Sequence, residues 1–330
     1  MSISCKRNGV NRNNPNLLAA ENQVRKLLGS YGILIVLFVM IVIMSFLSPR
    51  FLSWSNFLNI SRQISVMAIV GVGMTFVILS AGIDLSVGSI VALSGIMLSF
   101  SFQKLGLPIT ISIAIGLATA LLVGIVNGLL VARAGIPFFI VTLATMVIGR
   151  GLCFIITGGY PISQLGETFQ TVGRGYLGTI PVPVLITVVV FLWAWVLLNK
   201  MKFGRYVFAI GGNEEAAELA GISVQKMKIW IYGFCGFCCG IAALILTSRM
   251  NSGDPNMGTG IELDAIAAVV IGGTSITGGK GWLGGTLIGA YIIGILNNGL
   301  NMLDISAYYQ MAIKGLVIIL AVFLQRKLGE

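Results

Sequence analysis

The stretch ITISIAIGLATALLVGIVNGLLV, from Ile109 to Val131, contains no charged residue. An α-helix rises about 1.5 Å per residue and bilayer hydrocarbon is about 30 Å thick, so about 20 apolar residues are enough to cross it. Only helices and closed barrels satisfy their own backbone groups in lipid, and this stretch lacks the alternation of a barrel strand. It therefore predicts a membrane-spanning helix.

Nine other apolar runs accompany this one in a sequence that is 56% hydrophobic and only 10% charged. A soluble domain carries about 25% charged residues. The runs cover residues 31–47, 64–79, 87–102, 138–156, 182–198, 229–246, 265–273, 283–296 and 307–324, and the last three are less regular. We expect an all-α polytopic membrane protein of about ten transmembrane helices, some short or broken. The first run has no cleavage pattern, which predicts an uncleaved span.

The net charge of +10 sorts by loop. With a cytoplasmic N-terminus, the Lys and Arg residues expected inside are Lys6, Arg7, Arg12, Arg25, Lys26, Arg133, Lys200, Lys202, Arg205, Lys226, Lys228, Lys280, Arg326 and Lys327, and those outside are Arg50, Arg62, Lys104, Arg174 and Arg249. Cytoplasmic loops of membrane proteins carry an excess of basic residues, so both termini are expected in the cytoplasm. The basicity then reflects membrane topology, and we expect no nucleic-acid partner.

Three parts of the chain follow from this topology. They are a cytoplasmic N-terminal segment (residues 1–30), a transmembrane domain (31–325) with a cytoplasmic loop at about 200–228, and a cytoplasmic C-terminal tail (326–330). Residues 77–95 and 270–290 resemble each other, since each runs apolar, then Gly-rich and polar, then apolar with small residues. Internal repeats in transporters leave such traces.

Cysteines and small residues are expected to pack helices together. The cysteines are Cys5, Cys153, Cys235, Cys238 and Cys239, and the sequence has no His. Without His or a second Cys pair, a four-ligand metal site is not expected, and packing is the favoured role. Small residues at Gly116, Ala120 and Gly124, and at Gly284, Gly285 and Gly289, favour close approach of helices.

A short acidic helix is predicted within FAIGGNEEAAELAGI, residues 208–222. Gly211 and Gly212 are expected to break the preceding segment, Asn213 to cap the helix, and Gly221 to end it. Glu214 and Glu215 fall in the first turn, where negative charge suits the helix dipole. Two turns are too short to be stable alone in water. The helix must therefore dock, either on its own protein or on a cytoplasmic partner, and charge and length leave both open.

A family resemblance decides between them. The Glu215-Ala216-Ala217 triplet followed by Gly221 resembles the coupling-loop signature of ABC importer permeases. Four segments, SAGIDLSVGSIVALSG, GIPFFIVTLATMVIGRGLCFIITGG, FGRYVFAIGGNEEAAELAGISV and GTGIELDAIAAVVIGGTSITGGKGWLGGTLIGA, resemble the ribose/galactoside/xylose-type sugar permeases, in the order found there. The resemblance runs from about Phe51 to the C-terminus. Coupling loops of other importers continue to an Ile-x-Leu-Pro element, whereas here Ile231 leads into YGF, as is usual for this branch.

The resemblance implies half of a dimeric channel, homomeric or heteromeric, that imports a monosaccharide. The sequence has no GxxxxGK[ST] loop, so ATP and Mg²⁺ are expected on a cytoplasmic ABC ATPase, with two nucleotide-binding domains in one chain, and no cofactor on this chain. An external or periplasmic solute-binding protein would deliver the sugar. The residues expected to couple to the ATPase are Asn213, Glu214, Glu215, Ala216, Ala217, Glu218, Leu219 and Gly221.

Other polar residues have two interpretations each. Asn127, Asn297, Asn298 and Asn301 are candidates for the sugar path, although hydrogen bonds between helices explain them equally well. Asp254, Glu262 and Asp264 either help the binding protein to dock or form a solvated rim. Asp84 is expected to cap the helix near Leu85 or to pair with a basic loop, rather than to contact sugar. Arg150 and Lys314 are expected near span ends, where long side chains reach the interface.

Three other functions stay open on the sequence. A permease for branched-chain amino acids or another small solute would share the architecture, and transport assays would separate it. An ion-coupled secondary transporter would work without an ATPase, but carboxylates are scarce within the spans. A membrane enzyme lacks support, because the sequence has no His, no paired carboxylates in a span and no nucleophile elbow.

Overall fold

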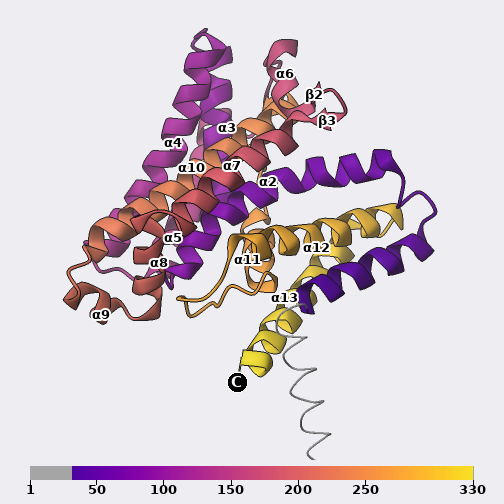
Figure 1. Cartoon of the computed structure of the whole chain (residues 1–330). Helices are drawn as coiled ribbons and strands as arrows, with labels where there is room; N and C mark the ends of the chain where they lie inside the picture. The colour runs from indigo at the N-terminus through magenta and orange to yellow at the C-terminus, as the bar shows by residue number, and fades with distance from the viewer. Residues whose placement is uncertain (1–31, 330) are drawn as a thin grey trace, which may run out of the picture.

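A computed structural model of the chain describes residues 32–329 (Figure 1). The predicted N-terminal segment, residues 1–30, lies outside them. The helices are Gly32–Leu47, α2 (Trp54–Leu79), α3 (Val87–Gln103), α4 (Ile109–Ala132), α5 (Phe138–Thr157), α6 (Glu167–Arg174), α7 (Val182–Asn199), α8 (Lys202–Gly212), α9 (Glu214–Leu219), α10 (Val224–Met250), α11 (Ile261–Ile271), α12 (Leu283–Met302) and α13 (Ala307–Gly329). The strands are β1 (Ile162–Ser163), β2 (Tyr176–Leu177), β3 (Ile180–Pro181) and β4 (Ser252–Gly253). The predicted all-α class is confirmed.

Six helices of the described part are long and apolar enough to cross a membrane: α2, α4, α5, α7, α10 and α12. The helix Gly32–Leu47 and α3 are shorter apolar helices. The expected run at residues 265–273 overlaps α11, which ends at Ile271 and whose 11 residues rise only about 16 Å, about half the hydrocarbon thickness. The count of about ten spans and the orientation of the termini stay predictions.

Helices α2 and α10 form the buried centre of the molecule. In its most apolar stretch α2 is 89% buried and α10 is 72% buried, whereas the same stretch is 22% buried in α4 and α5 and 28% buried in α7. A helix that is apolar on all sides yet largely uncovered suits contact with lipid. The outer helices therefore match a membrane environment, and the centre resembles the core of a soluble protein.

Small residues bring the helix backbones into direct contact, as predicted. A Cβ added to Gly124 of α4 would lie 2.4 Å from the carbonyl oxygen of Tyr232 in α10, and one on Gly236 would lie 2.4 Å from the carbonyl oxygen of Ala120. A Cβ on Gly289 of α12 would lie 2.0 Å from a carbonyl oxygen of α11. Such close approach strengthens van der Waals packing between helices in lipid.

The cysteines also pack helices, as predicted. Cys153, Cys235, Cys238 and Cys239 are free and buried, while Cys5 lies outside the described residues. The backbone of Gly73 in α2 faces α10 so closely that an added Cβ would lie 2.9 Å from Cys235 Cα. Cys235 and Cys238 therefore lie where the backbones of α2 and α10 meet.

The loops gather at two opposite ends of the bundle. At one end lie α9 and the α2–α3 turn, and the amide of Gly279 in the α11–α12 loop donates to the carbonyl of Leu79, 2.9 Å away. At the other end β1 pairs with β4, while α6, β2 and β3 project (Figure 1). The loops expected inside by their charge thus lie apart from those expected outside. Which end faces the cytoplasm stays a prediction.

Candidate functional site

Helix α9 begins and ends as the sequence predicts. The Asn213 side chain accepts a hydrogen bond from the amide of Ala216, 2.9 Å away, and so caps the helix. Gly221 has φ +82°, and its amide donates to the carbonyl of Glu218, 2.9 Å away. This left-handed conformation strains residues with a Cβ, which explains the glycine.

Only one side chain of α9 is buried against the rest of the described chain. Ala217 is 4% exposed, whereas Glu215, Ala216 and Glu218 are exposed and Leu219 is 90% exposed. Glu214 pairs with Lys228 at the start of α10, with Nζ and Oε1 2.6 Å apart. Since a six-residue helix is not stable alone, its own protein anchors it through Ala217, the Lys228 pair and its flanking loops. The rest of its surface is free to meet another molecule.

The two glycines before α9 have a different role from the one predicted. Gly211 and Gly212 do not break the preceding segment, because α8 continues through Gly212. A Cβ on Gly211 would lie 1.7 Å from the carbonyl oxygen of Leu79, while one on Gly212 would meet nothing within 4 Å. Gly211 is thus required by the close approach of two backbones rather than by a helix break.

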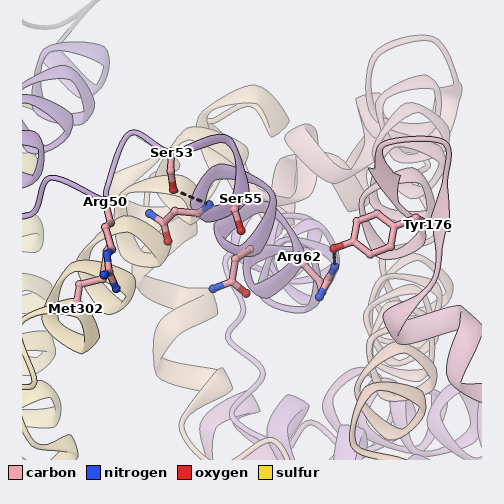
Figure 2. A pocket seen from close by; sticks show the side chains of 8 residues that line it. Arg50, Ser53, Ser55, Arg62, Tyr176 and Met302 are labelled. Atoms are coloured by element: carbon pink, nitrogen blue, oxygen red, sulfur yellow. Dashed lines mark hydrogen bonds between the residues drawn. The ribbon is translucent and has the colours of Figure 1, made fainter.

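A polar groove lies at the opposite end, between the first turns of α2 and the last turns of α12. It consists of two adjoining pockets of about 340 and 460 Å³ that share Asn59 and Arg62. Figure 2 shows the first pocket, with Arg62 pointing toward Tyr176 of β2. Amides line much of the second pocket: Asn59, Gln63, Asn297, Asn301 and Gln310. Such side chains offer both donors and acceptors of hydrogen bonds.

The groove is strongly basic. Arg50, Arg62, Arg249 and Lys314 line it. Lys314 pairs with Asp264, 2.9 Å away, whereas the three arginines have no carboxylate partner among residues 32–329. The Arg62 guanidinium donates to the Tyr176 hydroxyl and lies 4.8 Å from the centroid of that ring. Within the described residues, Arg62 Nε and Asn297 Oδ1 are buried without a hydrogen-bond partner. Planar guanidinium groups, amides and an aromatic ring can bind hydroxyl groups or carboxylates.

The four asparagines proposed for the sugar path fall into two pairs. Asn297 and Asn301 line the groove. Asn298 is 4% exposed and its side-chain nitrogen donates to Asn56, 3.0 Å away. Asn127 is fully buried, donates to Ser86 at 2.8 Å and accepts from Thr145 at 2.6 Å. The structure therefore brings two of the four to one cavity and uses the other two between helices.

The three carboxylates expected at the binding-protein surface already have partners within the chain. Asp264 pairs with Lys314, and Asp254 accepts from the amide of Asn256, 2.7 Å away. Glu262 accepts through Oε1 from the amide of Gly260 at 3.2 Å, and its Oε2 is buried. Each carboxylate thus shapes a loop or a helix start on the groove side of the bundle.

The comparisons with known proteins agree with this arrangement. The family model described as "Branched-chain amino acid transport system / permease component" matches residues 56–322. The chain belongs to this permease family. It is 50% identical over 299 residues to the ribose import permease protein RbsC of Haemophilus influenzae, covering 89% of this chain and 92% of that protein. The RbsC of Bacillus subtilis is 48% identical over 88% and 91% of the two chains.

A further relative carries a different sugar in its name. The D-allose transport system permease protein AlsC of Escherichia coli K12 is 38% identical over 91% of this chain and 92% of that protein. No solved structure matches the chain. The predicted resemblance to sugar permeases is confirmed, and the permease is a multi-pass protein of the inner membrane.

Two charged residues within the permease hold its helices to neighbouring segments. Arg150 donates from Nη1 to the carbonyls of Pro255 and Met257, 2.6 and 2.9 Å away, so it holds the β4–α11 loop against α5. Lys314 reaches Asp264 rather than the lipid interface. Asp84 does not cap α3 as predicted: the N-cap residue is Ser86, and Asp84 Oδ1 accepts from the amide and the hydroxyl of Ser86, 2.9 and 2.5 Å away, in the turn before the helix.

Sequence reasoning missed the arginines and Tyr176 of the groove. Hydropathy assigns Arg62 and Arg249 to outside loops, because the neighbouring apolar runs begin at residue 64 and end at residue 246. The permease begins α2 ten residues earlier, at Trp54, where Ser53 caps it by accepting from the amide of Asn56. A Ser followed by an amphipathic turn is the signal that could have extended the helix.

Proposed function

We propose that this chain is the membrane permease subunit of an ABC importer that carries a monosaccharide such as ribose. The names of the relatives, ribose and D-allose permeases at 50% and 38% identity along most of the chain, support the substrate class. On this proposal ATP and Mg²⁺ bind to a separate ATPase, and this chain neither holds a cofactor nor hydrolyses ATP.

The exposed face of α9 is the observation that supports a coupling role for this helix. A helix of small and acidic residues ending in Leu219, which is 90% exposed, presents an apolar knob to a partner. We propose that Asn213–Gly221 enters a groove of the cytoplasmic ATPase. The residues that would contact the ATPase most closely are Glu215, Ala216, Glu218 and Leu219. Ala217 faces its own chain and supports the helix from below.

The polar groove is the proposed outer part of the sugar path. A monosaccharide is neutral and rich in hydroxyls, and amides and guanidinium groups can form hydrogen bonds with those hydroxyls while an aromatic ring packs against the sugar. Asn297 and Asn301 would contact the sugar there. Asn127 and Asn298 stay candidates only if the helices that bury them separate during transport.

The loops around the groove are the proposed landing surface for an external solute-binding protein. The carboxylates Asp254, Glu262 and Asp264 have partners within the chain near these loops. They would contact the binding protein directly only if they gave up those partners, and otherwise their contribution to docking would be indirect. A second permease subunit, identical or homologous, would complete the channel. The two subunits would share one ATPase chain that contains two nucleotide-binding domains.

Branched-chain amino acids are the second candidate substrate. The description of the matching family names them, and the unpaired arginines of the groove suit a carboxylate better than a neutral sugar. An ion-coupled transporter would need neither an ATPase nor a binding protein, and membership of this family argues against it.

Uptake before and after removal of this permease tests the proposal. Cells are given labelled ribose, D-allose or leucine, with a matched strain in which the partner ATPase is inactive. We expect ribose or allose uptake to require both proteins. Loss of leucine uptake alone would select the second candidate, and uptake independent of the ATPase would contradict the ABC importer.

A further inference from the structure

Three segments meet backbone to backbone beside α9. We call this contact the glycine junction: Leu79 at the end of α2, Ala81 of the α2–α3 turn, Gly211 of α8, and Gly278 and Gly279 of the α11–α12 loop. The Gly279 amide donates to the carbonyl of Leu79, 2.9 Å away. A Cβ on Gly211 would lie 1.7 Å from the oxygen of that carbonyl and 2.6 Å from the Gly279 nitrogen. One on Gly278 would lie 2.8 Å from the Gly211 carbonyl oxygen.

The backbone at the junction adopts uncommon conformations. Gly278 and Gly279 have φ +83° and +71°, and Ala81 has φ +61° although it carries a Cβ. A residue other than glycine is disfavoured in the left-handed region, because its Cβ comes too close to the following carbonyl oxygen. The surrounding contacts therefore define the turn tightly, and no flexible side chain lies between the three segments to absorb a shift.

Each segment of the junction continues directly into a functional element. Gly211 lies three positions before Glu214, the first residue of α9. The α2–α3 turn continues to Asp84 and Ser86, and Ser86 accepts a hydrogen bond from Asn127 of α4. The α11–α12 loop continues into α12, whose far end lines the groove through Asn297 and Asn301. The turn and the loop are also the central parts of the two similar sequence segments, residues 77–95 and 270–290.

We infer that the glycine junction positions α9 relative to the α2–α3 turn and the α11–α12 loop. A displacement of α9 would then move that turn and the start of α12 together. This inference rests on the proposed coupling role of α9. On this inference Gly211, Gly278 and Gly279 are positioning residues, because they act through α9 and the adjoining helices. Packed backbone contacts of this kind transmit small shifts instead of deforming.

Gly211→Ala tests the inference, and the neighbouring Gly212→Ala is its matched control. A Cβ added to Gly212 would meet no atom within 4 Å, and the φ angle of Gly212 lies outside the left-handed region. Each variant is purified with the partner ATPase, reconstituted in vesicles, and tested for ATPase binding, ATP hydrolysis and sugar uptake. We expect Gly211→Ala to retain the ATPase and its basal hydrolysis while uptake per ATP falls at least tenfold. Gly212→Ala should stay within twofold of the wild type.

A second variant decides the matter if Gly211→Ala fails to reach the membrane. Two glycines inserted between Gly212 and Asn213 leave the junction packed but separate it from α9. We expect ATPase binding to persist and uptake per ATP to collapse. Normal uptake per ATP in this insertion variant or in Gly211→Ala, or equal damage in Gly212→Ala, would overturn the junction. If uptake by the wild type itself ignores the ATPase, the proposed function fails instead.

Discussion

The α9 end and the groove end of the permease are built from different kinds of contact. At the α9 end, glycines let backbones touch, and the exposed helix carries short side chains around Leu219. At the groove end glycines also bring backbones together, since a Cβ on Gly173 would lie 2.4 Å from the Arg249 nitrogen, but long polar side chains add contacts there, such as Arg174 Nε to the Arg249 carbonyl at 2.7 Å. Backbone contacts are stiff, whereas side chains can rearrange around a ligand. The first end suits transmission of motion and the second suits recognition.

The largest effect is expected from Ala216→Trp in α9. Ala216 is exposed, so the ring should not disturb the fold, but it should prevent a partner from closing over the helix. We expect the ATPase to be lost on co-purification and uptake to fall more than tenfold, at normal membrane expression. The control is Leu105→Trp, at an exposed residue of the opposite end, which should behave as the wild type. Retention of the ATPase by Ala216→Trp would contradict the claim that the α9 end, unlike the groove end, binds the ATPase.

Arg62→Ala in the groove is expected to lower sugar uptake at least tenfold without affecting ATPase binding. A hydrogen bond from a charged group is worth about 1.5–3 kcal/mol, which is about ten- to a hundredfold in affinity. Uptake at limiting sugar should therefore fall at least tenfold, while ATPase binding stays normal. The control Lys104→Ala removes a cation from the same end but outside the groove. Unchanged uptake by Arg62→Ala would remove the groove from the path.

A smaller effect, on stability rather than transport, is expected from Asn127→Leu. This change removes both of its hydrogen bonds and leaves the Thr145 hydroxyl without its partner, while the Ser86 hydroxyl keeps its hydrogen bond to Asp84. Each unsatisfied buried group costs about 1–3 kcal/mol, so thermal unfolding in detergent should occur several degrees lower. Affinity for sugar should not change in the folded fraction. A changed substrate preference at unchanged stability would return Asn127 to the sugar path.

Much of the helical framework could be predicted, because hydropathy reports contact with lipid. The expected runs at residues 109–131 and 138–156 match α4 and α5 within one residue. These helices are the least covered by the rest of the chain, so their composition is determined by the membrane. The ends of α2 and α12 were missed because their polar turns line the groove, and hydropathy assigns polar residues to loops.

The two ends also differed in how far the sequence could predict them. The caps of α9 are local, since Asn213 and Gly221 act within three residues, and both predictions are confirmed. The groove joins residues more than 100 positions apart, such as Arg62 and Tyr176, and no local pattern records that. The role of Gly211 was missed for the same reason, because Leu79 and Gly279 are distant in sequence.

A crosslink from α9 to the ATPase tests the central claim most directly. The four described cysteines are buried, so Ala216→Cys or Leu219→Cys supplies an exposed thiol in this part of the chain. In membranes containing the whole transporter, a short thiol-reactive crosslinker should join either variant to the ATPase. Leu105→Cys should give no product. Failure of both α9 variants to crosslink, with their thiols equally reactive whether the ATPase is present or absent, would contradict the account.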